Sequence, residues 1–172
     1  MPIVLIIEDG TSKPDSNSYV SVADARIYAS NRGTIFTGTD DEVAAMLIQA
    51  MDYLEAQACL YQGCKTLPQQ ALEWPRTGVC IHGQPFPTDA IPSQLIAAQV
   101  QLAMAVQAGY SLLPNYSAAD FVIREKVGPI ETEYANPVAV GIAPTFGAVD
   151  ALLAPLFGDC SVQKFAIRTI RV

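Results

Sequence analysis

The side chains best suited to chemistry in this sequence are three cysteines and the single histidine. Cys59, Cys64, Cys80 and His82 offer three thiols and one imidazole, a ligand set that zinc accepts. The spacing argues against a zinc site, because Cys59-x4-Cys64 and Cys80-x-His82 do not make two short ligand pairs. We therefore interpret the cysteines as free thiols that pack as small apolar residues, and keep zinc as the alternative.

Catalysis has little support from the other residue types. A Ser–His–Asp arrangement could use only His82, which lies in a loop rich in proline and glycine without a nucleophile elbow. No glycine-rich phosphate-binding pattern occurs. The acid pair Asp40-Asp41 is explained by the start of a helix, and Glu131 with Glu133 by pairing across two strands. We expect no enzyme activity, no catalytic residue, no metal and no cofactor.

The composition is acidic and poor in charge. The 172 residues include 10 Lys and Arg and 17 Asp and Glu, which gives a net charge of −7. Charged residues make up 16%, below the ~25% of an average soluble domain, so we expect part of the surface to face other protein. Because phosphates attract clusters of Lys and Arg, we expect no tight DNA binding by the isolated chain. The opening MPIVLIIEDG has neither a basic start nor a cleavage site, so we expect no signal peptide and reduced cysteines.

The element that must position the rest is the uncharged stretch from Pro92 to Gly109. Its apolar residues recur at helical spacing over most of the circumference, with Pro92 suited to a helix start and Gly109 to a helix end. Four glutamines within it argue against a membrane span. The pattern predicts the central helix of a small bundle.

Other elements are expected around this helix. Ser21 with Asp24 predicts a helix over 22–31, and the capping box Thr39-x-x-Glu42 predicts a helix that continues to about Leu60. Further expectations are a strand at 3–7, a helical turn at 68–73 inside a long loop over 61–89, and a last helix over 146–157. The fold class is predicted as mainly α, in a single domain spanning 1–172.

Two extended segments are predicted as docking arms. The alternation about Gly128-Pro129 predicts a β-hairpin over 121–134, and the locally basic segment 160–172 is interpreted as a second arm. The alternative is a solvated hairpin and a frayed chain end. The candidate interface residues are Arg124, Lys126, Glu131, Glu133, Tyr134, Lys164, Phe165, Ile167, Arg168, Ile170 and Arg171. Trp74, Pro75 and Arg76 are predicted to anchor the long loop, and Arg76 to form a salt bridge between subunits.

The sequence resembles a phage and prophage family over nearly its whole length. The residues that carry the resemblance are Asp52-Tyr53-Leu54, Tyr61-x-Gly63-x-Lys65-Thr66, Gln70-Ala71-Leu72-x-Trp74-Pro75-Arg76, Ile91-Pro92, the run from Arg124 to Glu131 and the closing Arg-Val. Members often carry the label of DnaT-like single-stranded DNA-binding proteins. The same sequences are similar to head–tail connector, or adaptor, proteins of tailed bacteriophages.

The resemblance implies two different functions. The first is a structural virion protein of the neck, a ring of twelve copies below the portal that extends the DNA channel, binds a tail or head-completion protein and lets double-stranded DNA pass. It would be made in the host cytoplasm and have no membrane contact. The alternative is a single-stranded DNA-binding accessory protein of replication, and a third class is a small zinc enzyme. Because of the acidic composition, we predict the connector.

Overall fold

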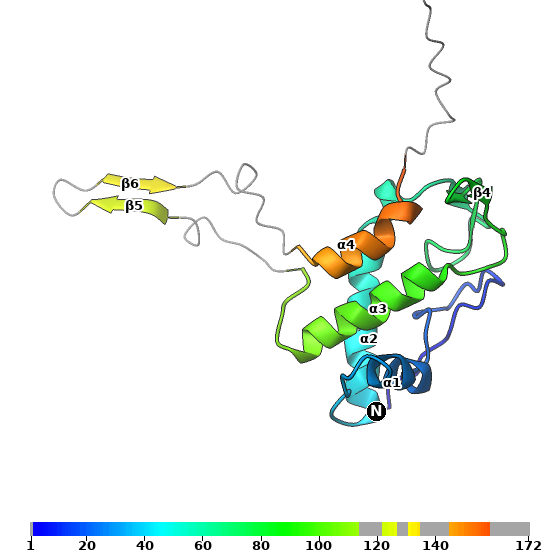
Figure 1. The fold of residues 1–172 in the computed structure, drawn as a ribbon, viewed down its shortest axis with the longest axis horizontal. Helices are drawn as coiled ribbons and strands as arrows, with labels where there is room; N and C mark the ends of the chain where they lie inside the picture. The colour runs from blue at the N-terminus through cyan, green and yellow to red at the C-terminus, as the bar shows by residue number, and fades with distance from the viewer. Residues whose placement is uncertain (1, 114–121, 127–130, 135–144, 159–172) are drawn as a thin grey trace, which may run out of the picture.

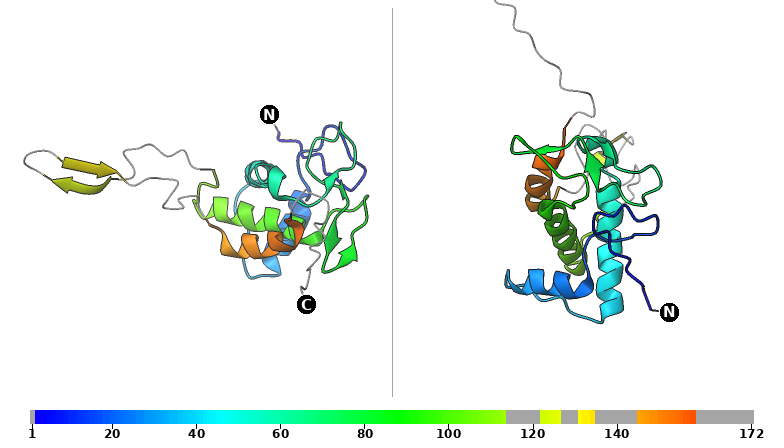
Figure 2. Two further views of the ribbon diagram at one scale, coloured as in Figure 1. Left: turned by 90° about the horizontal axis from the view of Figure 1, so that it is seen from above. Right: turned by 90° about the vertical axis from the view of Figure 1, so that its right-hand side faces the viewer.

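The structure is a computed structural model that describes residues 2–113, 122–126, 131–134 and 145–158. Its described helices are α1 (Val22–Ser30), α2 (Asp40–Glu55), α3 (Ser93–Gln107) and α4 (Gly147–Leu153), with short 3-10 helices η1 (Ala58–Leu60) and η3 (Ala154–Leu156). Helix α3 contacts α1, α2 and α4. The right-hand view of Figure 2 shows it between α2 and α4.

The predicted helix starts are confirmed by their caps. The Ser21 side chain accepts a hydrogen bond from the Asp24 backbone N–H, which satisfies one of the free donors at the start of α1. At α2 both halves of the capping box between Thr39 and Glu42 are present. Helix α3 begins after Pro92, and Gly109 follows its end with a φ of +91°, a backbone conformation that favours glycine.

Three two-stranded antiparallel sheets complete the described elements (Figure 1). Strand β1 (Cys64–Lys65) pairs with β2 (Arg76–Thr77), and β3 (Cys80–Ile81) pairs with β4 (Gln84–Pro85). Strands β5 (Val122–Lys126) and β6 (Glu131–Tyr134) pair with each other, which confirms strand pairing within the predicted hairpin. The register sets Arg124 opposite Glu133 and Lys126 opposite Glu131.

The prediction of a mainly α bundle is wrong. The two largest fully buried side chains, Trp74 and Tyr61, lie outside the α-helices. Both come from the segment between η1 and β2, which pairs with itself through β1 and β2 and so brings aromatic rings into the core. Helical periodicity cannot reveal a core that is completed by irregular and strand segments.

Three smaller predictions are also wrong. Residues 3–7 form no strand and contribute a single bridge, Ile7 with Ser18; the Ile6 N–H donates to the Asn17 side chain, and the Ile6 oxygen accepts from the Asn17 backbone N–H. No helical turn forms at 68–73, where the Gln70 side chain bonds the backbone of its own loop. Helix α2 also stops at Glu55, before the predicted end at Leu60. The last predicted helix is present as α4 followed by η3, which contains Pro155.

Helix length and polarity also bear on membrane insertion. Within the described ranges, no helix combines the length and the apolar character that crossing a bilayer requires.

Candidate functional site

A hollow of about 380 Å³ lies between α1, α3 and α4, and Tyr28 and Arg32 form one side of it. The lining residues are Tyr28, Arg32, Ser93, Gln94, Ile96, Ala97 and Leu152. We call it the α1–α3 groove. It combines apolar walls with one aromatic ring, one guanidinium and two small polar side chains.

The Tyr28 ring is fixed from two directions. The Arg32 guanidinium lies over the ring, with its central carbon 3.4 Å from the ring centroid. On the other element, Gln101 Nε2 of α3 donates a hydrogen bond of 3.3 Å to the Tyr28 hydroxyl. The ring also packs against the buried core cluster. Helices α1 and α3 therefore hold this aromatic ring in place at the groove.

The groove is locally positive in an acidic protein. Arg32 is the one charged residue in its lining, and no carboxylate lies there. The lining also includes Ser93 and Gln94, the first two residues of the 15-residue helix α3, which begins without a side-chain cap. The N-terminus of a helix carries a partial positive charge. The lining therefore combines one formal positive charge and this helix start with the last turn of α1, whose C-terminal end carries a partial negative charge.

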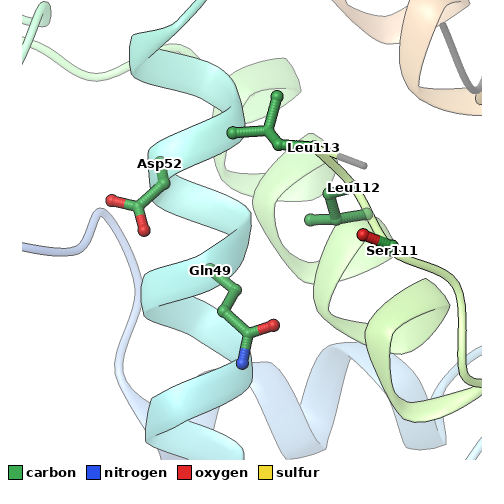
Figure 3. Close-up of a pocket in the computed structure, with 5 residues that line it drawn as sticks. All are labelled: Gln49, Asp52, Ser111, Leu112 and Leu113. Carbon is green, nitrogen blue, oxygen red and sulfur yellow. The ribbon is translucent and has the colours of Figure 1, made fainter. Parts of the chain in front are cut away.

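A smaller hollow has the opposite character. It measures about 180 Å³ and lies between α2 and the segment that follows α3. Its lining consists of Gln49, Asp52, Ser111, Leu112 and Leu113, so its only formal charge is the Asp52 carboxylate (Figure 3). A phosphate group would be repelled there.

A cluster of buried polar groups ties α2 to the N-terminal segment and to the loop before β2. Glu55 accepts hydrogen bonds from the Glu73 backbone N–H at 3.0 and 3.1 Å and from the Tyr19 hydroxyl at 3.2 Å. The Tyr19 hydroxyl in turn accepts a bond of 3.1 Å from the Trp74 backbone N–H. Burial raises the pKa of Glu55 to about 7, and the nearby Glu73 carboxylate adds to this effect.

Arg76 lies inside this cluster, with partners from its own chain. Its guanidinium pairs with the Glu73 carboxylate and also donates to the backbone oxygens of Gln62 at 2.7 Å and Gly63 at 2.9 Å. Lys65 contacts the same carboxylate at 3.1 Å. Only 5% of the Arg76 side chain is exposed and the ion pair described here lies within the chain, so the salt bridge between subunits stays a prediction.

The Trp74 indole occupies the centre of the aromatic core. It is fully buried and makes edge contacts with the rings of Tyr61 and Phe86, at centroid distances of 5.9 and 6.1 Å. The peptide bond to Pro75, which is also buried, is cis. These are the surroundings that an anchor of the long loop requires.

The structure separates the other residues singled out in the sequence. Cys59, Cys64 and Cys80 are exposed free thiols, so the expectation that they are packed away from solvent is wrong. Within the described ranges, no three His, Cys, Asp or Glu side chains are grouped to hold a metal ion.

The candidate interface residues of the predicted hairpin belong to β5 and β6; they are Arg124, Lys126, Glu131, Glu133 and Tyr134. Lys164, Phe165, Ile167, Arg168, Ile170 and Arg171 lie outside the described residues.

The α1–α3 groove itself was missed by reasoning from sequence. One available signal was the spacing of Tyr28 and Arg32, because residues four apart share a helix face. The other walls come from residues more than 60 positions further along the chain, at Ser93 and Leu152, and only the folded chain brings them together.

Comparison with family models gives a match over almost the whole chain. Residues 3–172 match the family described as "Putative DnaT-like ssDNA binding protein". Neither the curated proteins nor the solved structures contain a match.

The family match overturns the prediction of a head–tail connector, together with its virion, portal and neck roles, because the family description names binding of single-stranded DNA. The prediction was based on the net charge of −7, and a net charge does not describe local charge: the one charged residue in the lining of the α1–α3 groove is Arg32. The chain belongs to this DnaT-like family.

Proposed function

We propose that this protein binds single-stranded DNA, as a DnaT-like accessory protein of DNA replication. The observation that carries the proposal is the family match, which extends over residues 3–172 and thus over almost the whole chain. Proteins that bind single strands combine positive charge for the phosphates with aromatic rings on which bases stack. The α1–α3 groove has both, in Arg32 and Tyr28.

The groove is also better suited to DNA than the smaller hollow on electrostatic grounds. Its lining carries one positive charge, whereas the hollow beside α2 carries the Asp52 carboxylate. The apolar side chains Ile96 and Leu152 suit the face of a base, which is poorly solvated compared with a phosphate. We therefore place the DNA-binding site at this groove, with the Gln94 amide nitrogen in the lining as a hydrogen-bond donor, since the Ser93 hydroxyl already donates to Gln94 Oε1 at 3.3 Å.

The proposal is tested by titrating a fluorescently labelled oligonucleotide and following its anisotropy. We expect the single strand to bind at low salt with micromolar affinity, more weakly at moderate salt, and more tightly than a duplex of the same sequence. Absence of single-strand binding at low salt, or equal affinity for the duplex, would contradict the proposal.

The site is tested with two variants of equal charge change. Arg32→Gln removes one positive charge from the groove, and Gln49→Glu adds one negative charge at the other hollow. We expect Arg32→Gln to weaken binding and to reduce the slope of log K against log salt by about 0.7. Gln49→Glu should leave that slope unchanged. A reduced slope in Gln49→Glu together with an unchanged slope in Arg32→Gln would show that the DNA does not bind at the groove.

The predictions that the protein catalyses no reaction and associates with further copies of itself stay predictions. The predicted ring size, cellular location and partner proteins rested on the connector resemblance and are not proposed again.

A further inference from the structure

We propose that Tyr28 receives an unpaired base on the ring face that Arg32 now covers, and that Arg32 then contacts a phosphate of the same strand. This inference rests on the proposed function and names the part of the ligand that each residue recognises. It makes Tyr28 the residue that distinguishes single strands from duplexes.

Arg32 covers one face of the Tyr28 ring. The Arg32 guanidinium carbon is 3.4 Å from the Tyr28 centroid, the distance of direct stacking, so nothing else can occupy that face at the same time. Tyr28 is partly buried and packs against the core cluster. The face under Arg32 is therefore the one that a base entering from the groove could reach.

Arg32 is held over the ring by few contacts. Its residue is exposed, and its other contact is a hydrogen bond of 3.3 Å from Nη1 to the Tyr28 backbone oxygen. The ion pairs among the described residues do not include Arg32. Stacking of an exposed cation on an aromatic ring is weak, whereas a guanidinium binds phosphate with two parallel hydrogen bonds. When the Arg32 guanidinium leaves the Tyr28 ring and binds a phosphate, it therefore loses a weak contact and gains a charged partner.

The Tyr28 ring stays in place while Arg32 moves, because a different helix holds it. The bond from Gln101 Nε2 to the Tyr28 hydroxyl comes from α3, not from the helix that carries Arg32. The ring is therefore positioned before the strand arrives, and stacking costs little extra ordering of the protein. The groove volume of about 380 Å³ leaves space beside the ring for the incoming base.

The exchange accounts for selection of single strands. A base can stack on a side chain only when it has left its own stack, and every base has a face that can do so. The groove has one aromatic lining residue, so we expect one stacked base per protein and little dependence on base type. A duplex would offer Arg32 its phosphates but would leave the Tyr28 face unused.

The experiment compares an oligothymidine with an abasic oligomer of the same length, which keeps the phosphates and lacks the bases. We expect the full-length protein to bind oligothymidine about 5- to 150-fold more tightly than the abasic strand. Tyr28→Leu should abolish that preference and Tyr28→Phe should keep it. Tyr110→Leu, which removes an exposed tyrosine outside the groove lining, is the matched control and should also keep it.

The outcomes separate this inference from the proposed function. If Tyr28→Leu keeps the preference for oligothymidine, the stacking proposal is overturned while single-strand binding stands. If the unmodified protein binds neither strand, both are overturned. Arg32→Gln gives the second readout, because it should weaken binding of the abasic strand as well as of oligothymidine, while the ratio between the two persists. Loss of that ratio in Arg32→Gln would contradict the role of Arg32 as the phosphate contact.

Discussion

Gln99 is a buried polar side chain of α3 that joins three segments of the chain. Its Oε1 accepts a bond of 3.0 Å from the Tyr19 backbone N–H, and its Nε2 donates to Ser18 Oγ at 2.9 Å and to the Leu47 oxygen at 3.0 Å. The side chain is fully buried, so all three bonds form away from solvent. This amide therefore helps to hold the N-terminal segment against α2 and α3, alongside the bond from the Tyr19 hydroxyl to Glu55.

We predict that Gln99→Leu lowers the free energy of unfolding by about 1–3 kcal/mol. Leucine has a similar size, so the loss comes mainly from the Tyr19 N–H, which would stay buried without its partner. Urea unfolding measures the change. The control Gln49→Leu alters an exposed glutamine of α2 and should shift stability by less than about 0.5 kcal/mol. Equal effects of the two variants would remove Gln99 from this role.

Glu55 gives the stability a pH dependence of a definite sign. Its folded pKa of about 7 lies above the ordinary glutamate value of 4.5, so the folded state holds a proton that the unfolded state releases between these pH values. We predict that this carboxyl lowers stability as pH rises from about 4.5 to about 7, by on the order of 3 kcal/mol, and adds no further change above that range. Urea unfolding between pH 5 and pH 8 measures the profile.

The matched variant for this prediction is Glu55→Gln. It removes the titrating group and keeps an oxygen that can accept the bond from Tyr19. The variant should show a flatter stability profile than the unmodified protein between pH 5 and pH 7, whatever its stability at a single pH. Parallel profiles for the two proteins would show that another group dominates in this range.

The segment from η1 to β4 contains no α-helix, yet it contributes the two largest fully buried side chains of the core, Trp74 and Tyr61. Trp74 is fully buried against Tyr61, which belongs to the same segment, and against Phe86, which directly follows it. We predict that Trp74→Ala lowers the free energy of unfolding by about 3–5 kcal/mol, because it leaves a large cavity among packed rings. Thermal unfolding measures the loss, and Trp74→Phe should recover part of it. A small loss for Trp74→Ala would show that the segment is anchored elsewhere.

The elements differ in how far the sequence predicts them. The caps at Ser21 and Thr39 are local signals, and they predict both helix starts. Strands β1 and β2 are two residues each and pair across 13 positions, Cys64 with Thr77, so neither period nor propensity marks them. Their pairing depends on tertiary contacts such as those of Arg76 with the Gln62 and Gly63 oxygens. The same limit applies to the α1–α3 groove, which three separate elements line.

At the scale of the whole molecule, charge is distributed unevenly. The net charge of −7 opposes DNA at long range, and salt screens that repulsion within about 10 Å at 0.1 M. Binding therefore depends on the few cations that touch phosphates. Arg32 is the cation of the groove, and Lys164, Arg168 and Arg171 make the end of the chain the other basic part of the sequence.

The salt dependence of binding counts these contacts. If Arg32 alone neutralises a phosphate, log K should fall with log salt with a slope of about −0.7, whereas participation of Lys164, Arg168 and Arg171 would bring the slope to about −2.8. We predict the shallow slope, because the family match supports binding while the groove supplies one cation. Titrations at several salt concentrations, repeated after deletion of residues 160–172, separate the two cases. A steep slope that becomes shallow on deletion would assign most phosphate contacts to the C-terminal segment. The groove would then contribute mainly the stacked base.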